Sequence, residues 1–326
     1  MKTLSTIKLL AAASLLFINI SCKKEQETMR FANPNAANFQ SLRNKALHDL
    51  TQNKTFNSED GIVFTSVKGT KVTIPAGCLE DLDGNPISGE VQLSFVEIYD
   101  KGNMVVTNKP VMGRNQDGDL LPLVTGGEFD IQITQGTKIL KSPCSYSVVV
   151  PANLTGDLDY GMVLWQGNIN ADGNLEWDTA DKEAGQERGL RADEKTNSYN
   201  IWNGQFGWTN VDRFYSHTGP KTQIKVAVPN VYNNENSAVY LAYEDQPNLL
   251  AQLDTYNEAE NFFSEHYGFV PVGIKLHVIF TSESNGSIVY AIREVTIADG
   301  SVVNISESDL NTTSQSQLIT LINALN

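Results

Sequence analysis

Cysteine and histidine are scarce in this chain, and long apolar runs are missing. Its 326 residues include three cysteines and four histidines, without a GxSxG, HExxH, CxxC or P-loop pattern. The sequence therefore predicts no enzyme, no metal site and no cofactor, and a hydrolase without a recognised motif is a remote alternative. No stretch reaches the roughly 20 consecutive apolar residues that a membrane-spanning helix needs.

Basic residues are too few to balance the acids. Lys and Arg number 24 against 38 Asp and Glu, which gives a formal net charge of −14. Loss of residues 1–21, which hold two lysines and no acid, takes this charge to −16. So acidic a chain is repelled by phosphate backbones, which excludes nucleic acid as a partner. With 40% hydrophobic and 19% charged residues, the composition is that of a folded globular protein.

The N-terminus has the order of a secretory signal peptide. Two lysines precede the apolar stretch 9–20, and a serine and Cys22 follow it directly. The segment INISC resembles the lipobox of bacterial lipoproteins, in which the cysteine is acylated and becomes the first residue of the mature chain. The resemblance implies that residues 1–21 are removed and that Cys22 is the lipidation site.

The residues after Cys22 bear on location. Lys23 stands where many Gram-negative lipoproteins of the inner membrane have aspartate, so we expect a lipid-anchored outer-membrane protein on the periplasmic or the extracellular face. The charged run 23–27 resembles signals that send some lipoproteins to the cell surface, and a solvated tether is the alternative. Residues 22–35 are polar and extend at most about 45 Å.

Hydrophobic periodicity predicts a mainly β protein with a short helix near each end. Apolar residues at helical spacing predict an amphipathic helix over 36–52, and Ser314 with Gln317 form a capping box before a C-terminal helix. Between them, apolar and polar residues alternate as in half-buried strands. Dipeptides that favour tight turns separate these strands: Asp83-Gly84, Asp117-Gly118, Asp172-Gly173, Asn285-Gly286 and Asp299-Gly300. We expect tandem antiparallel β-sandwich domains.

The expected boundaries divide the chain into five parts. They are the signal peptide 1–21, the lipidated tether with the amphipathic helix 22–56, a β-sandwich 57–155, an aromatic-rich β region 156–215, and a second β-sandwich-like domain 216–326. A polar loop is expected within the fourth part, over 178–198, because that stretch has almost nothing to bury.

Residues 69–98 resemble a β-sandwich module of bacterial surface lipoproteins and, more distantly, ZU5-like domains and the extracellular domain of cartilage intermediate layer proteins. The shared pattern is a strand, an IPAG turn, a DxxG-x-P-x-x-G hairpin and a second strand. GGEF at 126–129 and GWTNVDRF at 207–214 also resemble parts of this lipoprotein group. The resemblance implies a β-sandwich fold and, because ZU5-like relatives act in protein assembly, binding rather than catalysis.

Two further sites concern covalent chemistry. Cys78 and Cys144 are an even pair in an exported chain, so a disulfide is allowed, and two buried free thiols are the alternative. Asp178-Thr179-Ala180 is similar to the sequon for O-glycosylation in exported proteins of some Gram-negative bacteria, with Thr179 as the acceptor. A chance tripeptide explains it equally well.

Aromatic residues gather between 199 and 215, where six occur in 17 positions. Clustered aromatics usually lie in a core or between modules; the alternative is a sugar-stacking surface made by Tyr199, Trp202 and Trp208. Our first hypothesis is a lipid-anchored, non-enzymatic scaffold or adhesion protein with a protein partner. The second is a glycan-binding accessory lipoprotein that uses this aromatic stretch.

Overall fold

A computed structural model describes residues 31–170, 173–180, 188–266 and 268–325. The predicted signal peptide, Cys22 and the tether residues up to 30 lie outside them. The described chain is mainly β with a short helix near each end, and the predicted fold class is confirmed. None of the helices in these ranges combines the length and the apolar character that a membrane crossing requires.

The helices begin at side chains that satisfy free backbone amides. They are α1 (Ala36–Leu50), α2 (Lys101–Thr107) and α3 (Gln315–Asn323). The Asn35 side chain begins α1 by accepting a hydrogen bond of 3.0 Å from the amide of Asn38. The predicted capping box of Ser314 and Gln317 is confirmed at the start of α3.

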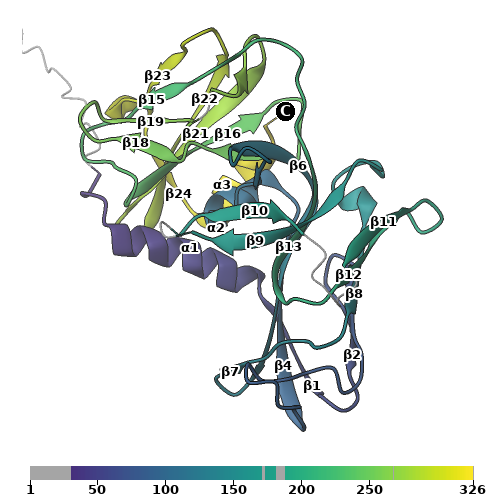
Figure 1. Ribbon diagram of the computed structural model, residues 1–326. Helices are drawn as coiled ribbons and strands as arrows, with labels where there is room; N and C mark the ends of the chain where they lie inside the picture. Colours follow the sequence, from purple (N-terminus) through teal and green to yellow (C-terminus); the bar gives the residue numbers. More distant parts are fainter. Residues whose placement is uncertain (1–30, 171–172, 181–187, 267, 326) are drawn as a thin grey trace, which may run out of the picture. The chain divides into compact units, whose positions relative to one another are not determined.

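The first sandwich consists of two sheets (Figure 1). In the described ranges, the first sheet contains β1 (Gln52–Asn57), β4 (Glu90–Ile98), β6 (Leu120–Gln135), β13 (Gly207–Phe214), β9 (Val163–Ile169), β10 (Leu175–Thr179) and β5 (Met112–Arg114) in spatial order, with β7 (Lys138–Ile139) paired to β6. The second sheet contains β11 (Gly189–Asp193), β12 (Ser198–Asn203), β8 (Tyr146–Pro151), β3 (Lys71–Ile74) and β2 (Ile62–Thr65). A 3-10 turn, η1 (Ala152–Leu154), follows β8.

The second sandwich follows in the chain. A sheet of four described strands contains β18 (Thr255–Asn257), β19 (Phe262–Ser264), β15 (Lys225–Ala227) and β23 (Val302–Asn304). A sheet of five contains β17 (Leu250–Gln252), β16 (Ser237–Tyr243), β21 (Lys275–Ser284), β22 (Ser287–Thr296) and β24 (Asn311–Thr313). The pair β14 (Lys221–Thr222) and β20 (Val270–Pro271) and the 3-10 turn η2 (Glu307–Asp309) complete it. Asn285 and Gly286, with φ of 51° and 80°, form the predicted tight turn between β21 and β22.

The boundary predicted near residue 155 does not divide the fold. Strands β9, β10 and β13 belong to the first sheet, and β11 and β12 extend the second, so residues 156–215 are part of the first sandwich rather than a region of their own. Within the predicted loop 178–198, residues 189–193 form β11, and 181–187 lie outside the described residues. Two pairs, β5 with β10 and β15 with β23, are parallel in a fold predicted to be antiparallel.

Strand β6 departs from the predicted pattern of one dry and one wet face. Phe129, Ile131 and Ile133 are buried between the two sheets of the first sandwich. Asp130 alternates with these apolar residues, which predicts a solvated position for it, yet it is only 7% exposed. The opposite face is covered because a second hydrophobic core joins it to the helices and to the second sandwich. That core includes Val96, Ile98 and Trp208 of the sheet, Phe39 and Ala46 of α1, Val105 of α2, Leu318 and Ile322 of α3, and Tyr240 and Ile279 of β16 and β21.

Close contact between α2 and α3 holds this layer together. A Cβ atom on Gly102 would lie 2.7 Å from the carbonyl oxygen of Ile319, so only glycine permits the observed approach. The amide of Gly102 donates to Oδ1 of Asn323 at 2.7 Å, and Nδ2 of Asn323 donates to Oδ1 of Asp100 at 2.9 Å. The end of the chain is thereby attached to the start of α2.

A disulfide joins Cys78 to Cys144 with the Cα atoms 5.6 Å apart. Cys78 follows β3 and Cys144 precedes β8, which are paired strands of the second sheet. Ser142 lies between the two half-cystines, and its hydroxyl donates to the carbonyl oxygens of Cys78 and Cys144 at 3.1 and 2.8 Å. The bridge therefore fixes the segment that leads from β7 back to β8.

Reduction of this bridge is expected to destabilise the protein by about 2–4 kcal/mol, because the bridge closes a long loop in the unfolded chain. Urea unfolding of Cys22→Ala protein with and without reductant measures the effect. The matched control adds Cys78→Ala and Cys144→Ala, and its midpoint should not respond to reductant. Equal midpoints for the oxidised and reduced parent protein would contradict the prediction.

Candidate binding groove and buried carboxylates

The predicted sugar-stacking residues do not form a shared surface. Tyr199 on β12 is 1% exposed and Trp208 on β13 is 8% exposed, so neither ring is available to a ligand, and these two assignments are wrong. Trp208 instead packs edge-on against Trp177, with ring centroids 6.3 Å apart. Trp202, at 41%, remains open to solvent. Burial at the junction, the other interpretation of this stretch, accounts for Tyr199 and Trp208.

The remaining predicted sites lie apart from one another. Thr179 is an exposed residue at the end of β10, where its position leaves it accessible to modification. Cys22 lies outside the described residues. The disulfide lies in the first sandwich, next to a groove that the sequence did not predict.

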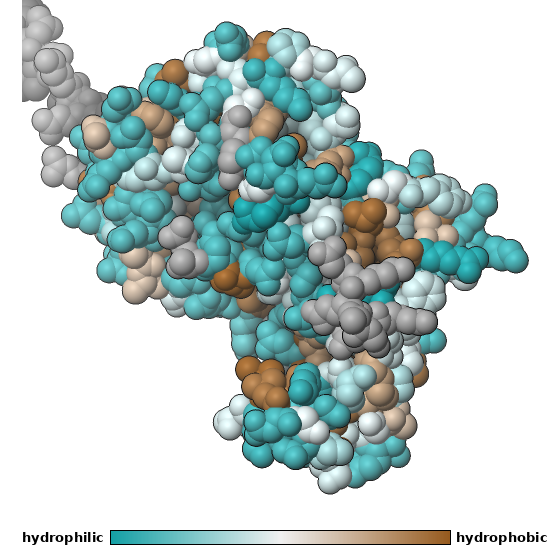
Figure 2. Space-filling view, viewed as in Figure 1, coloured by the Kyte–Doolittle hydropathy of each residue, from teal (hydrophilic) through white to brown (hydrophobic). Residues whose placement is uncertain are grey.

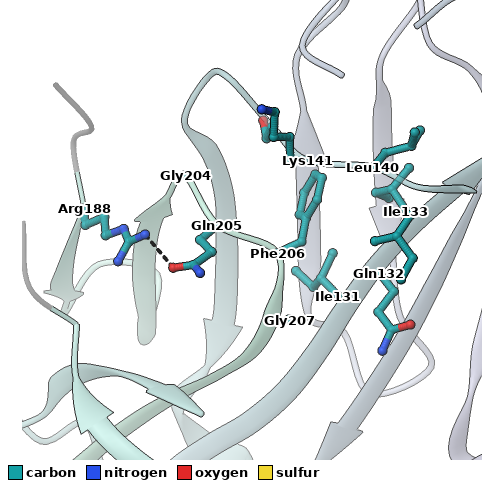
Figure 3. Close-up of a pocket in the computed structure, with 12 residues that line it drawn as sticks. Ile131, Gln132, Ile133, Leu140, Lys141, Arg188, Gly204, Gln205, Phe206 and Gly207 are labelled. Atoms are coloured by element: carbon teal, nitrogen blue, oxygen red, sulfur yellow. Dashed lines mark hydrogen bonds between the residues drawn. The ribbon is translucent and has the colours of Figure 1, made fainter. Parts of the chain in front are cut away.

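The groove has a volume of about 470 Å³ and lies in the first sandwich (Figure 3). It is formed by β6 around Gln132, by the segment 139–142 from β7 onward, by Arg188, and by residues 204–207 between β12 and β13. Such a volume is typical of sites that bind a small molecule or a few side chains of a partner. Two stretches that are about 45 residues apart in sequence, 131–142 and 188–207, meet here, so the sequence could not indicate it.

The floor of the groove is the hydrophobic core itself. Ile131, Ile133 and Leu140 belong to the core between the two sheets and also line the groove. Phe206 packs on Tyr146 with ring centroids 5.1 Å apart, and the Tyr146 hydroxyl donates to the carbonyl oxygen of Gln205 at 2.8 Å. This bond holds the 204–207 segment in place, so the groove is preformed.

The rim combines an exposed apolar residue with cations. Ile139 on β7 is 61% exposed, and Figure 2 shows a hydrophobic patch over this strand. Lys141 is exposed, and its Nζ donates to the carbonyl oxygen of Leu82 at 3.3 Å. Arg188 donates from Nη2 to Oε1 of Gln205 at 2.7 Å, as the dashed line in Figure 3 marks. Arg188 is only 8% exposed, so Lys141 is the exposed cation among the described lining residues. An apolar groove beside one exposed cation suits a partner that brings an apolar group next to an acidic one.

A second group of polar residues is buried on the covered face of the first sheet. Glu128 on β6 lies opposite Asn210 on β13, where a bulge separates Asn210 from Asp212. Nδ2 of Asn210 donates to Oδ2 of Asp212 at 2.6 Å, and the Thr125 hydroxyl donates to Oδ1 of Asn210 at 2.8 Å. Lys109, just after α2, lies over the Trp208 ring with Nζ 5.6 Å from its centroid.

Burial controls the ionisation of this group. Glu128 is 0% exposed, and neither of its carboxylate oxygens has a hydrogen-bond partner among the described residues. Burial, together with the charge of Asp212, raises the pKa of Glu128 well above its usual value. Burial also raises the pKa of Asp212, and it raises that of Asp130 to about 6. Burial lowers the pKa of Lys109, against the attraction of Glu128.

These carboxyl groups suit a structural role. Perturbed pKa values are typical of active sites, but Glu128 and Asp212 are both inaccessible to a substrate. In the part of the chain that the structure describes, no three His, Cys, Asp or Glu residues are placed to hold a metal ion. Glu128 lies in the GGEF segment and Asp212 in the GWTNVDRF segment, and an acidic residue beside an apolar one in each strand is the sequence signal for this cluster.

A scan with protein-family models and a search of curated proteins both found no match to this chain.

Replacing Glu128 by Gln should flatten the dependence of stability on pH. Because the pKa of Glu128 is higher in the folded than in the unfolded state, the folded protein binds more protons between the two values. The free energy of unfolding therefore falls as pH rises above about 4.5, by at most about 1.4 kcal/mol per pH unit. Urea unfolding from pH 4.5 to 8 measures it. Glu90→Gln, at an exposed position, is the control and should keep the wild-type slope, whereas parallel curves for Glu128→Gln and wild type would refute the assignment.

Proposed function

We propose that this protein is an exported, lipid-anchored outer-membrane protein that binds a protein partner in the groove of its first sandwich. The observation that carries the proposal is the groove itself, which joins the apolar side chains of Ile139 and Phe206 to the exposed cation Lys141. Residues 69–98 resemble the ZU5-like module of bacterial surface lipoproteins, and the proposal includes that the chain belongs to this group.

The occupant that fits this groove best is an extended peptide segment of a partner, with a large apolar side chain next to an acidic one. The apolar side chain would contact Ile139, which is 61% exposed, and the half-buried Phe206, and the carboxylate would lie near Lys141. The exposed Lys141 supports one acidic side chain at this point of the groove. The net negative charge of the protein opposes a segment with many acids, so we expect one acidic residue beside the apolar one. The preformed walls favour binding because little has to be ordered when the peptide arrives.

The order of the N-terminal residues supports export and lipidation, with Cys22 at the predicted cut. The disulfide adds to this because such bonds form and persist in oxidising compartments. It also leaves Cys22 as the third cysteine, without a partner cysteine in the chain.

Binding rather than catalysis is supported by the position of the perturbed acids. Glu128 and Asp212 have the raised pKa values that acid–base catalysis can use, but both are fully buried. The groove, by contrast, is lined mainly by aliphatic and aromatic side chains with amides and cations at its edge. This lining is suited to holding a ligand.

Cys22→Ala is expected to release the protein from membranes, because the lipid is the proposed membrane contact. Detergent phase partitioning and intact mass measure the change: wild type should enter the detergent phase with acyl mass, and the variant should not. Ser21→Ala, which keeps a small residue and the cysteine, is the control and should remain lipidated. A membrane-bound, unlipidated Cys22→Ala protein would exclude the anchor.

Charge and polarity changes at the groove rim should weaken peptide binding. Selection from a displayed library of random peptides against the wild-type protein is expected to enrich sequences with a large apolar residue beside Asp or Glu. Ile139→Asp and Lys141→Glu should weaken binding of an enriched peptide by about tenfold or more, through lost apolar contact and charge repulsion.

Val63→Asp is the matched control, because Val63 on β2 is 62% exposed, as Ile139 is 61%. It should bind the enriched peptide as wild type does. Peptides whose affinity changes equally in all three variants, or a selection without acidic residues, would contradict the proposal.

A further inference from the structure

A second hollow lies on the other sandwich and differs in chemistry from the groove. It has a volume of about 650 Å³ and is formed by the loop between β15 and β16 and the turn between β18 and β19. Four asparagines and two glutamates dominate its lining, with Tyr256 as the aromatic member. In Figure 2 the surface over β18 and β19 is mostly hydrophilic. We call this hollow the amide pocket.

Hydrogen bonds hold one wall of the amide pocket rigid. Asn261 adopts the left-handed conformation, with φ of 56°, and its Nδ2 donates to the carbonyl oxygen of Val228 at 2.5 Å and to Oδ1 of Asn230 at 3.2 Å. The Tyr256 hydroxyl donates to the carbonyl oxygen of Tyr232 at 3.1 Å. The two loops are thus joined to each other before any ligand arrives.

The remaining lining residues of the amide pocket leave three polar side chains free. Oδ1 of Asn233 accepts from the amides of Glu235 and Asn236 at 2.9 and 3.2 Å, which shapes the loop. The side chains of Asn234, Glu235 and Glu258 make no hydrogen bond to the described residues, and all three are exposed. An amide and two carboxylates therefore remain available at the mouth of a preformed hollow.

The chemistry of this lining excludes several ligand classes. Its residues include no lysine or arginine, and Glu235 and Glu258 would repel an anion. Its few apolar groups give little surface for an apolar ligand. The described residues place no set of three His, Cys, Asp or Glu side chains together here, which does not favour a divalent metal ion.

We propose that the amide pocket binds a neutral carbohydrate. A sugar hydroxyl both donates and accepts hydrogen bonds, so it matches an amide such as Asn234, which does the same, and a carboxylate such as Glu258, which accepts. Tyr256 packs on Phe263 with ring centroids 4.9 Å apart, and the part of its ring that lines the pocket is available to the C–H groups of a sugar ring. The rigid wall lowers the entropic cost of binding.

This assignment moves glycan binding away from the aromatic stretch 199–215, where the sequence had suggested it. The amide pocket shares no lining residue with the groove of the first sandwich. The carbohydrate proposal can therefore be tested independently of the proposed peptide binding.

The test uses the full chain on an array of neutral and acidic oligosaccharides, followed by titration of the best neutral glycan. Wild type is expected to bind one or more neutral glycans, with or without EDTA. Asn234→Ala and Glu258→Ala should each weaken binding by about tenfold or more, because each removes hydrogen bonds to hydroxyls. Glu258→Gln should recover part of the loss, since the amide oxygen still accepts.

Asn57→Ala and Glu90→Ala, at exposed positions of the first sandwich, are the matched controls and should bind as wild type does. Neither pocket substitution removes a hydrogen bond within the protein, so unchanged thermal unfolding is expected for both. The proposal is overturned by the absence of neutral-glycan binding at millimolar concentration, by binding that survives Asn234→Ala and Glu258→Ala, or by binding that needs a divalent cation.

Discussion

Strand β6 is buried on both faces from Leu123 to Ile131, and the positions of the other elements follow from this. One face packs into the core between the two sheets of the first sandwich through Phe129 and Ile131. The other face meets the helices and the second sandwich through a second core that includes the sheet residue Trp208. Because a face with apolar residues has to be covered, the second sandwich and the helical layer pack on the first sheet as one compact unit from residue 31 onward. Figure 1 shows the helices and the β9–β10 hairpin between the strands of the two sandwiches.

The polar residues on that covered face have an energetic cost that the apolar core must offset. Removing a carboxylate from water is unfavourable, so Glu128 and Asp212 hold protons more tightly than exposed acids do. The attraction of Lys109 opposes this shift for Glu128, and the hydrogen bonds of Asn210 and Thr125 satisfy part of the group. Hydrophobic residues of similar volume would be at least as stable here. The cluster therefore contributes directional contacts rather than net stability.

Local features of the fold could be predicted from the sequence, and long-range ones could not. The helix at 36–50, the capping box at Ser314 and the turn at Asn285-Gly286 depend on residues close together in the chain. The pairing of β13 with β6 joins residues about 80 positions apart, and alternation alone does not identify a partner strand. The prediction that one face of β6 is solvated is wrong for the same reason, because the elements that cover this face come from distant parts of the chain.

Neither candidate binding site could be predicted from the sequence, because each is formed by segments that only the tertiary structure brings together. For the groove, the disulfide connects this dependence to export. The wall made by residues 140–142 is attached to the IPAG segment by the bridge from Cys144 to Cys78 and by two backbone hydrogen bonds between Glu80 and Lys141, of 3.0 and 2.9 Å. In a reducing compartment only the hydrogen bonds would remain, and the loop that carries Lys141 would regain freedom. The groove is thus best ordered where disulfides form, so the site and the proposed location outside the cytosol depend on the same pair of cysteines.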